Sequence, residues 1–399
     1  MLVHIIFGVL FAFGILTLWV PAVWPASIFE AGTFLLCLFV LWRKWPARIP
    51  YPAWPLLFAV AWGLVQLRAH WSAYAFDTEV ALLRWGAFLC VFVIAYCLFV
   101  DAGPRSWFRH AMLWFGFLVS VWATLESFTS GGKIFWIFPT ENSFVMGPIL
   151  YHNHYAAFVE IVLPIALFEA LRREGNALLY TGMAAALYGS VLASTSRAGT
   201  ILTTAEILVV VILMMARGYT TGRDIGVAAL RILVVFGVFT VVVGWERVWE
   251  RFWQPDPMQV RREFAESTLR MIAAHPLTGT GLGTWPTVYP HFALVDIGLF
   301  ANQAHNDWLQ FFSEGGILFG LAILSIFLWI LRPAFRSIWG IGAIAVFLHA
   351  IVDFPFSLPA LGAWTMLMVG MLAARQATTK KQSATNGVSR NTSFGVKDI

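Results

Sequence analysis

Two short segments of the chain combine arginine with histidine in a pattern suited to an anionic substrate. Residues 261–276 read RREFAESTLRMIAAHP, and residues 305–320 read HNDWLQFFSEGGILFG. The guanidinium group of arginine stays charged, and its planar fork binds phosphate oxygens in pairs. The imidazole of histidine can take up a proton near neutral pH. These residue types indicate a site that neutralises a phosphate group and removes a proton from a second reactant.

The arginines of the first segment differ in their expected helical neighbours. Arg262, Glu266 and Arg270 are spaced i, i+4 and i+8, so they can form a ladder of charge pairs. This ladder is the simpler explanation for both arginines. Arg261 has only apolar residues at i+3 and i+4. Because no acidic helical neighbour neutralises it, Arg261 is the better candidate for binding an external anion.

Arg197 and His305 both lie where an apolar segment meets a polar one. Arg197 belongs to STSRAGT (194–200), whose small residues leave room for a ligand; an arginine that anchors the chain at the interface is the alternative. His305 precedes an expected helix, where the helix dipole disfavours a charged imidazole and so favours a ring that can accept a proton. A capping histidine is the alternative there.

Four further ionisable residues fall within or beside apolar segments, at the depth of a membrane. They are Glu160, Glu206, and His349 with Asp353 four residues later. Ionisable residues at such depth are costly and are functional candidates by default. Structural pairing with each other or with a nearby arginine is the alternative, and for Glu206 it is the favoured one.

The composition shows what kind of element must carry these residues. Of the 399 residues, 59% are apolar or aromatic and 12% are charged, and the mean hydropathy is +0.75. A soluble domain carries about 25% charged residues. These values exclude a soluble enzyme, a disordered protein and a nucleic-acid-binding domain, and the net charge of +5 is explained by membrane topology. We expect an all-α, polytopic integral membrane protein.

About twelve apolar segments approach the length of about 20 residues that a membrane-spanning helix needs. The first lacks the features of a cleaved signal peptide and is expected to stay as a helix. Lysine and arginine gather in alternate loops, which places both termini in the cytoplasm. The expected spans are 4–20, 26–42, 53–68, 80–100, 107–128, 154–171, 177–193, 200–216, 226–244, 306–331, 338–352 and 358–374.

Three parts of the chain follow from this pattern. Residues 1–375 form the membrane domain, and residues 376–399 are polar and expected to be a disordered cytoplasmic tail. Residues 245–304 form one large extracytoplasmic loop between the ninth and tenth spans. Its aromatic content argues against disorder, and 257–274 predicts an amphipathic helix that ends before Pro276.

Several patterns of cofactor chemistry are absent from the sequence. There is no P-loop, no GxGxxG after a strand, no HExxH and no Asp-x-Asp that would hold a metal on a nucleotide sugar. Cys37, Cys90 and Cys97 lie in apolar runs without a CxxC spacing, so we expect neither a zinc site nor a disulfide framework. We therefore expect no metal and no cofactor, and a phosphate-bearing substrate would be bound by arginines alone.

The combination of these segments resembles a known family. SRAGT between two spans, RREFAESTLRMIAAHPLTGTGLGTW (261–285) in the large loop and HNDWLQFFSEGG at the next helix start resemble the O-antigen ligase and O-antigen polymerase superfamily of bacterial membrane glycosyltransferases. NHYAAFVEIVLPIAL (153–167) also fits the family pattern. The resemblance extends over roughly residues 75–375 and implies a GT-C-like fold.

The resemblance also implies roles for particular residues. The donor would be a glycan on undecaprenyl diphosphate; Arg197 and Arg261 would hold the diphosphate, and His305 would be the base that activates an acceptor hydroxyl. Family members often have Trp four residues after the helix arginine, where this chain has Ala265, so Arg262 stays an alternative to Arg261. The candidates for further contact with substrate are Arg262, Arg270, His154, Asn153, Glu160 and Asn306.

Two classes of function remain open at this point. In the first, the protein is a metal-independent glycosyltransferase at the periplasmic face of the bacterial inner membrane. It would be an O-antigen ligase with lipid A–core as acceptor, or alternatively a polymerase of O-antigen or exopolysaccharide. In the second, it is a flippase for a lipid-linked oligosaccharide. The cations cluster at the external boundary and not near mid-membrane, which favours the transferase.

Overall fold

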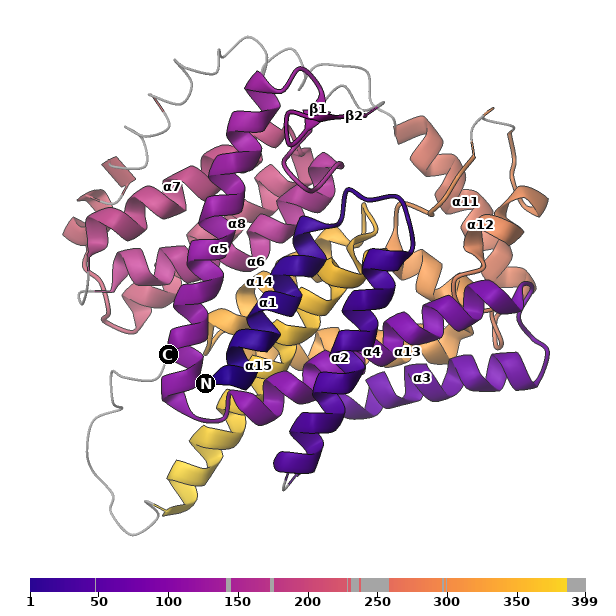
Figure 1. Cartoon of the computed structure of the whole chain (residues 1–399), viewed down its shortest axis with the longest axis horizontal. Coiled ribbons are helices and arrows are strands. Elements are labelled where there is room, and N and C mark those ends of the chain that lie inside the picture. Colours follow the sequence, from indigo (N-terminus) through magenta and orange to yellow (C-terminus); the bar gives the residue numbers. More distant parts are fainter. Residues whose placement is uncertain are drawn as a thin grey trace.

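The computed structural model describes residues 1–46, 48–140, 145–172, 176–227, 229–230, 237, 258–295, 298 and 300–385. The part described is almost entirely helical (Figure 1). The helices that match expected spans are α1 (Leu2–Leu16), α2 (Trp24–Arg43), α3 (Ala53–Arg68), α4 (Ala75–Leu98), α5 (Ala102–Thr129), α6 (His152–Leu171), α7 (Ala177–Ser194), α8 (Arg197–Ala216), α13 (Asp307–Ala334), α14 (Ile338–His349) and α15 (Pro359–Thr385).

The helices confirm an all-α polytopic membrane protein. Seven of them, α2, α4, α5, α6, α7, α8 and α13, are long and apolar enough to cross a membrane, and α1, α3 and α14 are shorter apolar helices. A helix satisfies its own backbone hydrogen bonds, which lipid cannot do, so long apolar runs in a membrane fold as helices. Every expected span has a helix in its place except 226–244, which lies largely outside the described residues.

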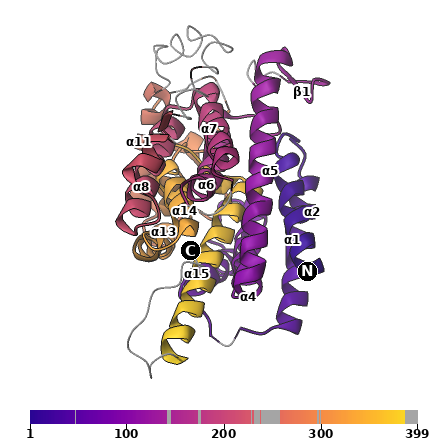
Figure 2. The same cartoon turned by 90° about the vertical axis from the view of Figure 1, so that its left-hand side faces the viewer.

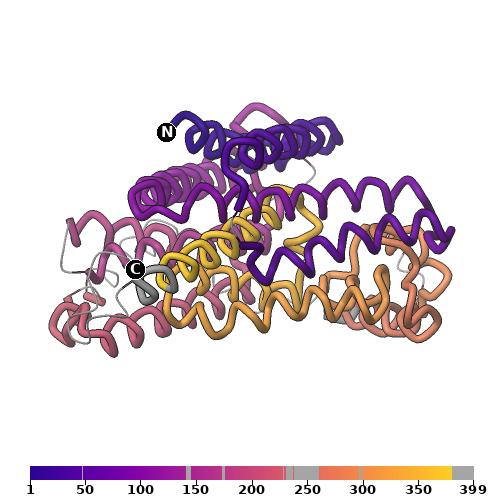
Figure 3. Tube along the Cα trace, turned by 90° about the horizontal axis from the view of Figure 1, so that it is seen from below, coloured from indigo at the N-terminus to yellow at the C-terminus, as the bar shows by residue number. Residues whose placement is uncertain are grey.

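Helix α6 lies at the centre of the bundle, and its apolar window is wholly buried inside the protein. It packs against α7, α8 and α14. Gly342 allows α14 to come close, because a Cβ atom there would lie 2.6 Å from the carbonyl oxygen of Glu160. Figure 2 shows α6 and α14 between α8 and α5. Seen from below, α1 and α2 lie along one side of the molecule, and α8 and α13 lie along the other (Figure 3).

The described part of the large loop is folded and contains the amphipathic helix that the sequence predicts. Helix α11 (Met258–Ala274) is followed by a glycine-rich turn, by α12 (Trp285–Val288) and by the short 3-10 helix η1 (Tyr289–His291). One face of this unit forms a small apolar core of its own. Its buried members are Phe264, Met271, Trp285, Val288, Tyr289 and Ala304.

The glycine-rich turn is docked onto a kink in α13. At the kink, Gly316 has φ 71° and ψ −178°, and a Cβ atom there would collide with the carbonyl of Leu277. The amide of Ile317 donates to the carbonyl of Pro276 at 2.8 Å. Glycine is therefore required at 316 both for the backbone angle and for the close approach of the turn.

Two polar side chains of the bundle bind the same turn. Gln66 on α3 donates from Nε2 to the carbonyl oxygens of Thr278, at 2.7 Å, and Glu314, at 2.8 Å. The carboxylate of Glu314 accepts from the amides of Gly283, at 2.8 Å, and Trp285, at 3.2 Å. These contacts fix the end of α11 relative to α13.

Two features of the structure differ from the expected pattern. Strands β1 (Lys133–Ile134) and β2 (Phe138–Pro139) form a short hairpin after α5. Helix α15 continues to Thr385, well into the segment expected as a disordered tail; residues 386–399 lie outside the described part. Thr378 explains part of this extension, because its hydroxyl donates to the carbonyl of Val100 at 2.7 Å and accepts from Arg105 at 3.3 Å.

Candidate functional site

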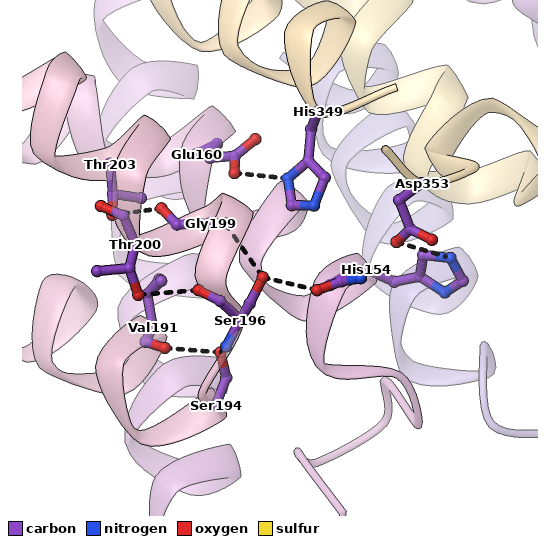
Figure 4. Close-up of polar contacts among 11 residues, drawn as sticks. His154, Glu160, Val191, Ser194, Ser196, Gly199, Thr200, Thr203, His349 and Asp353 are labelled. Carbon is purple, nitrogen blue, oxygen red and sulfur yellow. Dashed lines mark hydrogen bonds and ion pairs between the residues drawn. The ribbon is translucent and has the colours of Figure 1, made fainter. Parts of the chain in front are cut away.

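One buried carboxylate brings two histidines together. Oδ2 of Asp353 lies 3.5 Å from Nε2 of His154, and Oδ1 lies 3.5 Å from Nδ1 of His305. The three residues come from the start of α6, the segment just before α13 and the loop after α14. Figure 4 shows the contact between His154 and Asp353. A carboxylate between two imidazoles is an arrangement that can orient a general base.

The backbone around Asp353 is tied to the start of α13. The amide of Asp307 donates to the carbonyl oxygens of Ala350, at 2.9 Å, and Asp353, at 3.1 Å. The carboxylate of Asp307 in turn accepts from the amide of Phe356 at 2.8 Å. The loop that carries Asp353 and the helix that follows His305 are therefore held in register with each other.

The environment of Asp353 favours its charged form. Burial by itself would raise the pKa of this carboxyl, since only 2% of the residue is exposed. The nearby His154, His305 and His349 act in the opposite direction and hold the pKa below its usual value. Asp353 is therefore an anion at neutral pH, able to support an imidazole that takes up a proton.

His305 is held at the opening of α13, as the sequence predicts. Asn306 is the N-cap of α13 and accepts from the amide of Leu309 at 3.0 Å. The ring of His305 lies between Phe264 of α11, with ring centroids 6.0 Å apart, and Phe354, with centroids 4.8 Å apart. Its side chain is 32% exposed. Since Nδ1 faces Asp353, Nε2 is the nitrogen left to meet an acceptor.

The backbone of His305 has φ 51°, in the left-handed region that side chains other than glycine rarely adopt. Such strained residues gather at functional sites and cost about 1–3 kcal/mol each. In this conformation the side chain of His305 contacts Asp353 and the rings of Phe264 and Phe354.

The arginines of α11 occupy two environments. Arg262 is 83% exposed and pairs with Glu266 at 3.0 Å, so the first rung of the expected ladder forms. Arg270 is also exposed, and among the described residues it forms no second rung with Glu266. Arg261 is half-buried, and its charge acts on His349. Phe264, one turn along α11, covers His305, so Arg261 faces the bundle.

Arg197 is the first residue of α8, and the start of this helix is attached to the start of α6. The Ser196 hydroxyl caps α8 by accepting from the amide of Gly199 at 3.1 Å. The same hydroxyl donates to Oδ1 of Asn153 at 2.7 Å. Asn153 therefore positions the helix that carries Arg197, and its neighbour His154 is 2% exposed behind Asp353.

The pairing of His349 differs from the one suggested by its spacing to Asp353. Helix α14 ends at His349, so Asp353 does not lie one helical turn further on. Nδ1 of His349 instead lies 2.7 Å from Oε1 of Glu160 on α6, and both side chains are fully buried. Glu206 on α8 is also buried, and neither of its carboxylate oxygens has a hydrogen-bond partner among the described residues.

Sequence reasoning missed the contact of Asp353 with His305 and the docking residues Gln66 and Glu314. The signal for Asp353 was limited to its being an acid beside an apolar segment. Gln66 gave no signal, because its partners lie more than 200 residues away. Glu314 could have been noticed as a carboxylate inside an otherwise apolar span.

The comparison with known proteins agrees with the motifs. The family model described as O-antigen ligase matches residues 182–324, a range that contains SRAGT, the described part of the large loop and the start of α13. No curated protein matches the chain. This match supports the resemblance of the chain to the O-antigen ligase and O-antigen polymerase superfamily of bacterial membrane glycosyltransferases.

Proposed function

We propose that this protein transfers a glycan from undecaprenyl diphosphate to a sugar hydroxyl of an acceptor. The reaction would take place at the periplasmic face of the bacterial inner membrane, with both termini in the cytoplasm. One observation carries the proposal: the ring of His305 contacts Asp353 through Nδ1 and lies under Phe264 of the arginine-bearing helix α11. The proposed base, His305, and the proposed anion-binding helix, α11, thus meet at the start of α13.

The arginines would neutralise the leaving group. Arg197, at the start of α8, and Arg261, on the inner face of α11, are the proposed ligands of the diphosphate. As the bond between the sugar C1 and the diphosphate oxygen breaks, its electron pair stays on that oxygen. Fixed cations in a site with little water stabilise such charge, by about 3–4 kcal/mol for a single donor. Arg262 and Arg270, on the outer face, would attract the anionic donor at longer range.

His305 would prepare the nucleophile. Its Nε2 takes the proton of the acceptor hydroxyl while the hydroxyl oxygen forms the new bond to C1. Asp353 holds Nδ1 and stabilises the imidazolium that results. Attack opposite the diphosphate inverts C1. Because the diphosphate is already a good leaving group, the reaction as proposed needs no metal, and we expect it to survive EDTA.

The acceptor decides which member of the superfamily this is, and we propose lipid A–core, the acceptor of a ligase. The test is to reconstitute the purified protein with an undecaprenyl-diphosphate-linked glycan and each acceptor. Glycan on lipid A–core supports the ligase. Elongation of a second lipid-linked glycan would make the protein a polymerase, and movement of the donor across the vesicle without transfer would make it a flippase.

The matched variant in this assay is His305→Ala. We expect kcat to fall by about 10²–10⁴-fold, because a positioned general base contributes a factor of this size. Membrane insertion and the midpoint of thermal unfolding should be the same as in the wild type, because the side chain of His305 is partly exposed. Near-normal product from the variant would remove His305 from its role as the base.

A further inference from the structure

A third histidine near the site has no role in the mechanism above. His349, on α14, is bonded through Nδ1 to Glu160 of α6 at 2.7 Å, and neither side chain is exposed. Glu160 accepts this hydrogen bond, so any second proton of the ring is carried by Nε2. A buried carboxylate without a counter-charge is very costly, and this cost favours a charged imidazole beside it.

The other nitrogen of this ring is unsatisfied. Nε2 of His349 is buried and has no hydrogen-bond partner among the described residues. Figure 4 draws Ser196 beyond the lower edge of the His349 ring, and α14 packs against α8. Ser196 is the N-cap of α8, which begins with Arg197. The positive end of the α8 dipole therefore lies on this side of the ring.

The charges around His349 leave its Nε2 without an anionic partner among the described residues. Glu160, Asp353 and Arg261 all act electrostatically on the ring. Glu160 is already engaged with Nδ1, and Asp353 lies between His154 and His305. Arg261 and the start of α8 add positive charge from two different elements. A buried donor in such surroundings is suited to an anionic oxygen.

We propose that His349, held by Glu160, is a further ligand of the donor's diphosphate, with Nε2–H donating to a phosphate oxygen. This inference rests on the proposed function, because it concerns the same substrate. His349 forms no covalent bond in this role; it would hold the leaving group and share the charge that develops on it. Since Nε2 is closed to solvent, the elements packed around it must move apart for a phosphate oxygen to reach it.

Binding of inorganic pyrophosphate and of undecaprenyl diphosphate to the protein in nanodiscs tests this role directly. His349→Gln should weaken both affinities about tenfold or more, the usual loss for a hydrogen bond to a charged group. Glu160→Gln should weaken them in the same direction, because the ring loses the carboxylate that favours its charge. His110→Gln is the matched control: His110 lies 3.9 Å from buried Glu169 at the other end of the bundle, and affinity should not change.

Folding is checked by the thermal transition in each variant. If either single variant does not fold, the double variant His349→Leu with Glu160→Leu removes both buried polar groups together, and it should still bind pyrophosphate weakly. A folded variant without His349 that binds pyrophosphate like the wild type overturns the inference.

The outcome is separable from that of the transfer assay. Pyrophosphate binding that depends on His349, in a protein that transfers no glycan, would leave this inference standing and overturn the proposed function. If the protein transfers glycan but binds pyrophosphate equally well without His349, the proposed function stands and this inference is overturned. A wild-type protein that binds neither probe would contradict the inference.

Discussion

The carboxylate of Asp353 lies between two imidazole rings, 3.5 Å from a nitrogen of each. At the scale of single residues, this arrangement determines what His305 can do. A proton on Nδ1 of His305 is favoured by the anion beside it, which leaves Nε2 unprotonated and directed away from Asp353. His154 is buried on the far side of the same carboxylate, so it is better placed to hold Asp353 than to reach a bulky glycan.

Asp353→Asn should lower stability in a pH-dependent way. The pKa of Asp353 is lowered in the folded protein, so its stabilising effect is present above the ordinary carboxyl pKa and is lost as pH falls through the folded value. We expect a loss of about 1–3 kcal/mol at neutral pH. Thermal unfolding measured from neutral to acid pH should show the difference between variant and wild type shrinking as pH falls. A constant difference would contradict an ionised Asp353.

At the scale of elements, α11 presents two faces. The outer face carries Arg262, paired with Glu266, and exposed Arg270. The inner face carries Phe264 against His305 and brings the charge of Arg261 to His349. The two faces of α11 thus direct Arg261 toward the site and leave Arg262 and Arg270 in solvent.

Arg261→Ala and Arg197→Ala should each reduce kcat/KM for the lipid-linked donor by about 100-fold, as expected for a lost cation at a developing charge. Arg270→Ala should cost about fivefold at most, because an exposed charge is screened. Initial rates at several donor concentrations measure this. Equal losses for all three variants would mean that the two faces of α11 do not differ.

The docked turn is the second element that positions the site. Glu314→Ala removes the acceptor of two amides, Gly283 and Trp285, and should destabilise the turn by about 1–3 kcal/mol for each donor left unpaired. Hydrogen exchange of residues 278–285 should become faster, and kcat should fall with little change in the pH profile. Glu266→Ala, on the exposed face of α11, is the control. Unchanged exchange in the Glu314 variant would show that the turn is held by other contacts.

At the scale of the whole molecule, the sequence predicts local features well. The apolar runs predict the membrane helices, and residues 257–274 predict the amphipathic α11, because both signals lie within one element. The contacts of Asp353 and Gln66 join residues far apart in the chain and leave no local pattern. The same holds for His349, whose partner Glu160 lies 189 residues away.

The orientation of the bundle gives a prediction at this scale. In a variant without the native cysteines, Leu277→Cys, which is 64% exposed in the turn docked at Gly316, should react with a membrane-impermeant thiol reagent added to the periplasm. Phe335→Cys, 51% exposed just after α13, should react only after the inner membrane is opened. The opposite labelling pattern would turn the site toward the cytoplasm and contradict the proposed donor.

The kink at Gly316 has a consequence for the depth of the reaction. The part of α13 after it, Ile317–Ala334, is about 27 Å long at 1.5 Å per residue, close to the roughly 30 Å thickness of a bilayer's hydrocarbon core. If Ile317–Ala334 crosses the hydrocarbon core, the first turns of α13, with His305 just before them, would lie level with the lipid headgroups. A polyprenyl carrier could present its phosphates there with its tail still in the leaflet, so catalysis would not have to extract the carrier from the membrane.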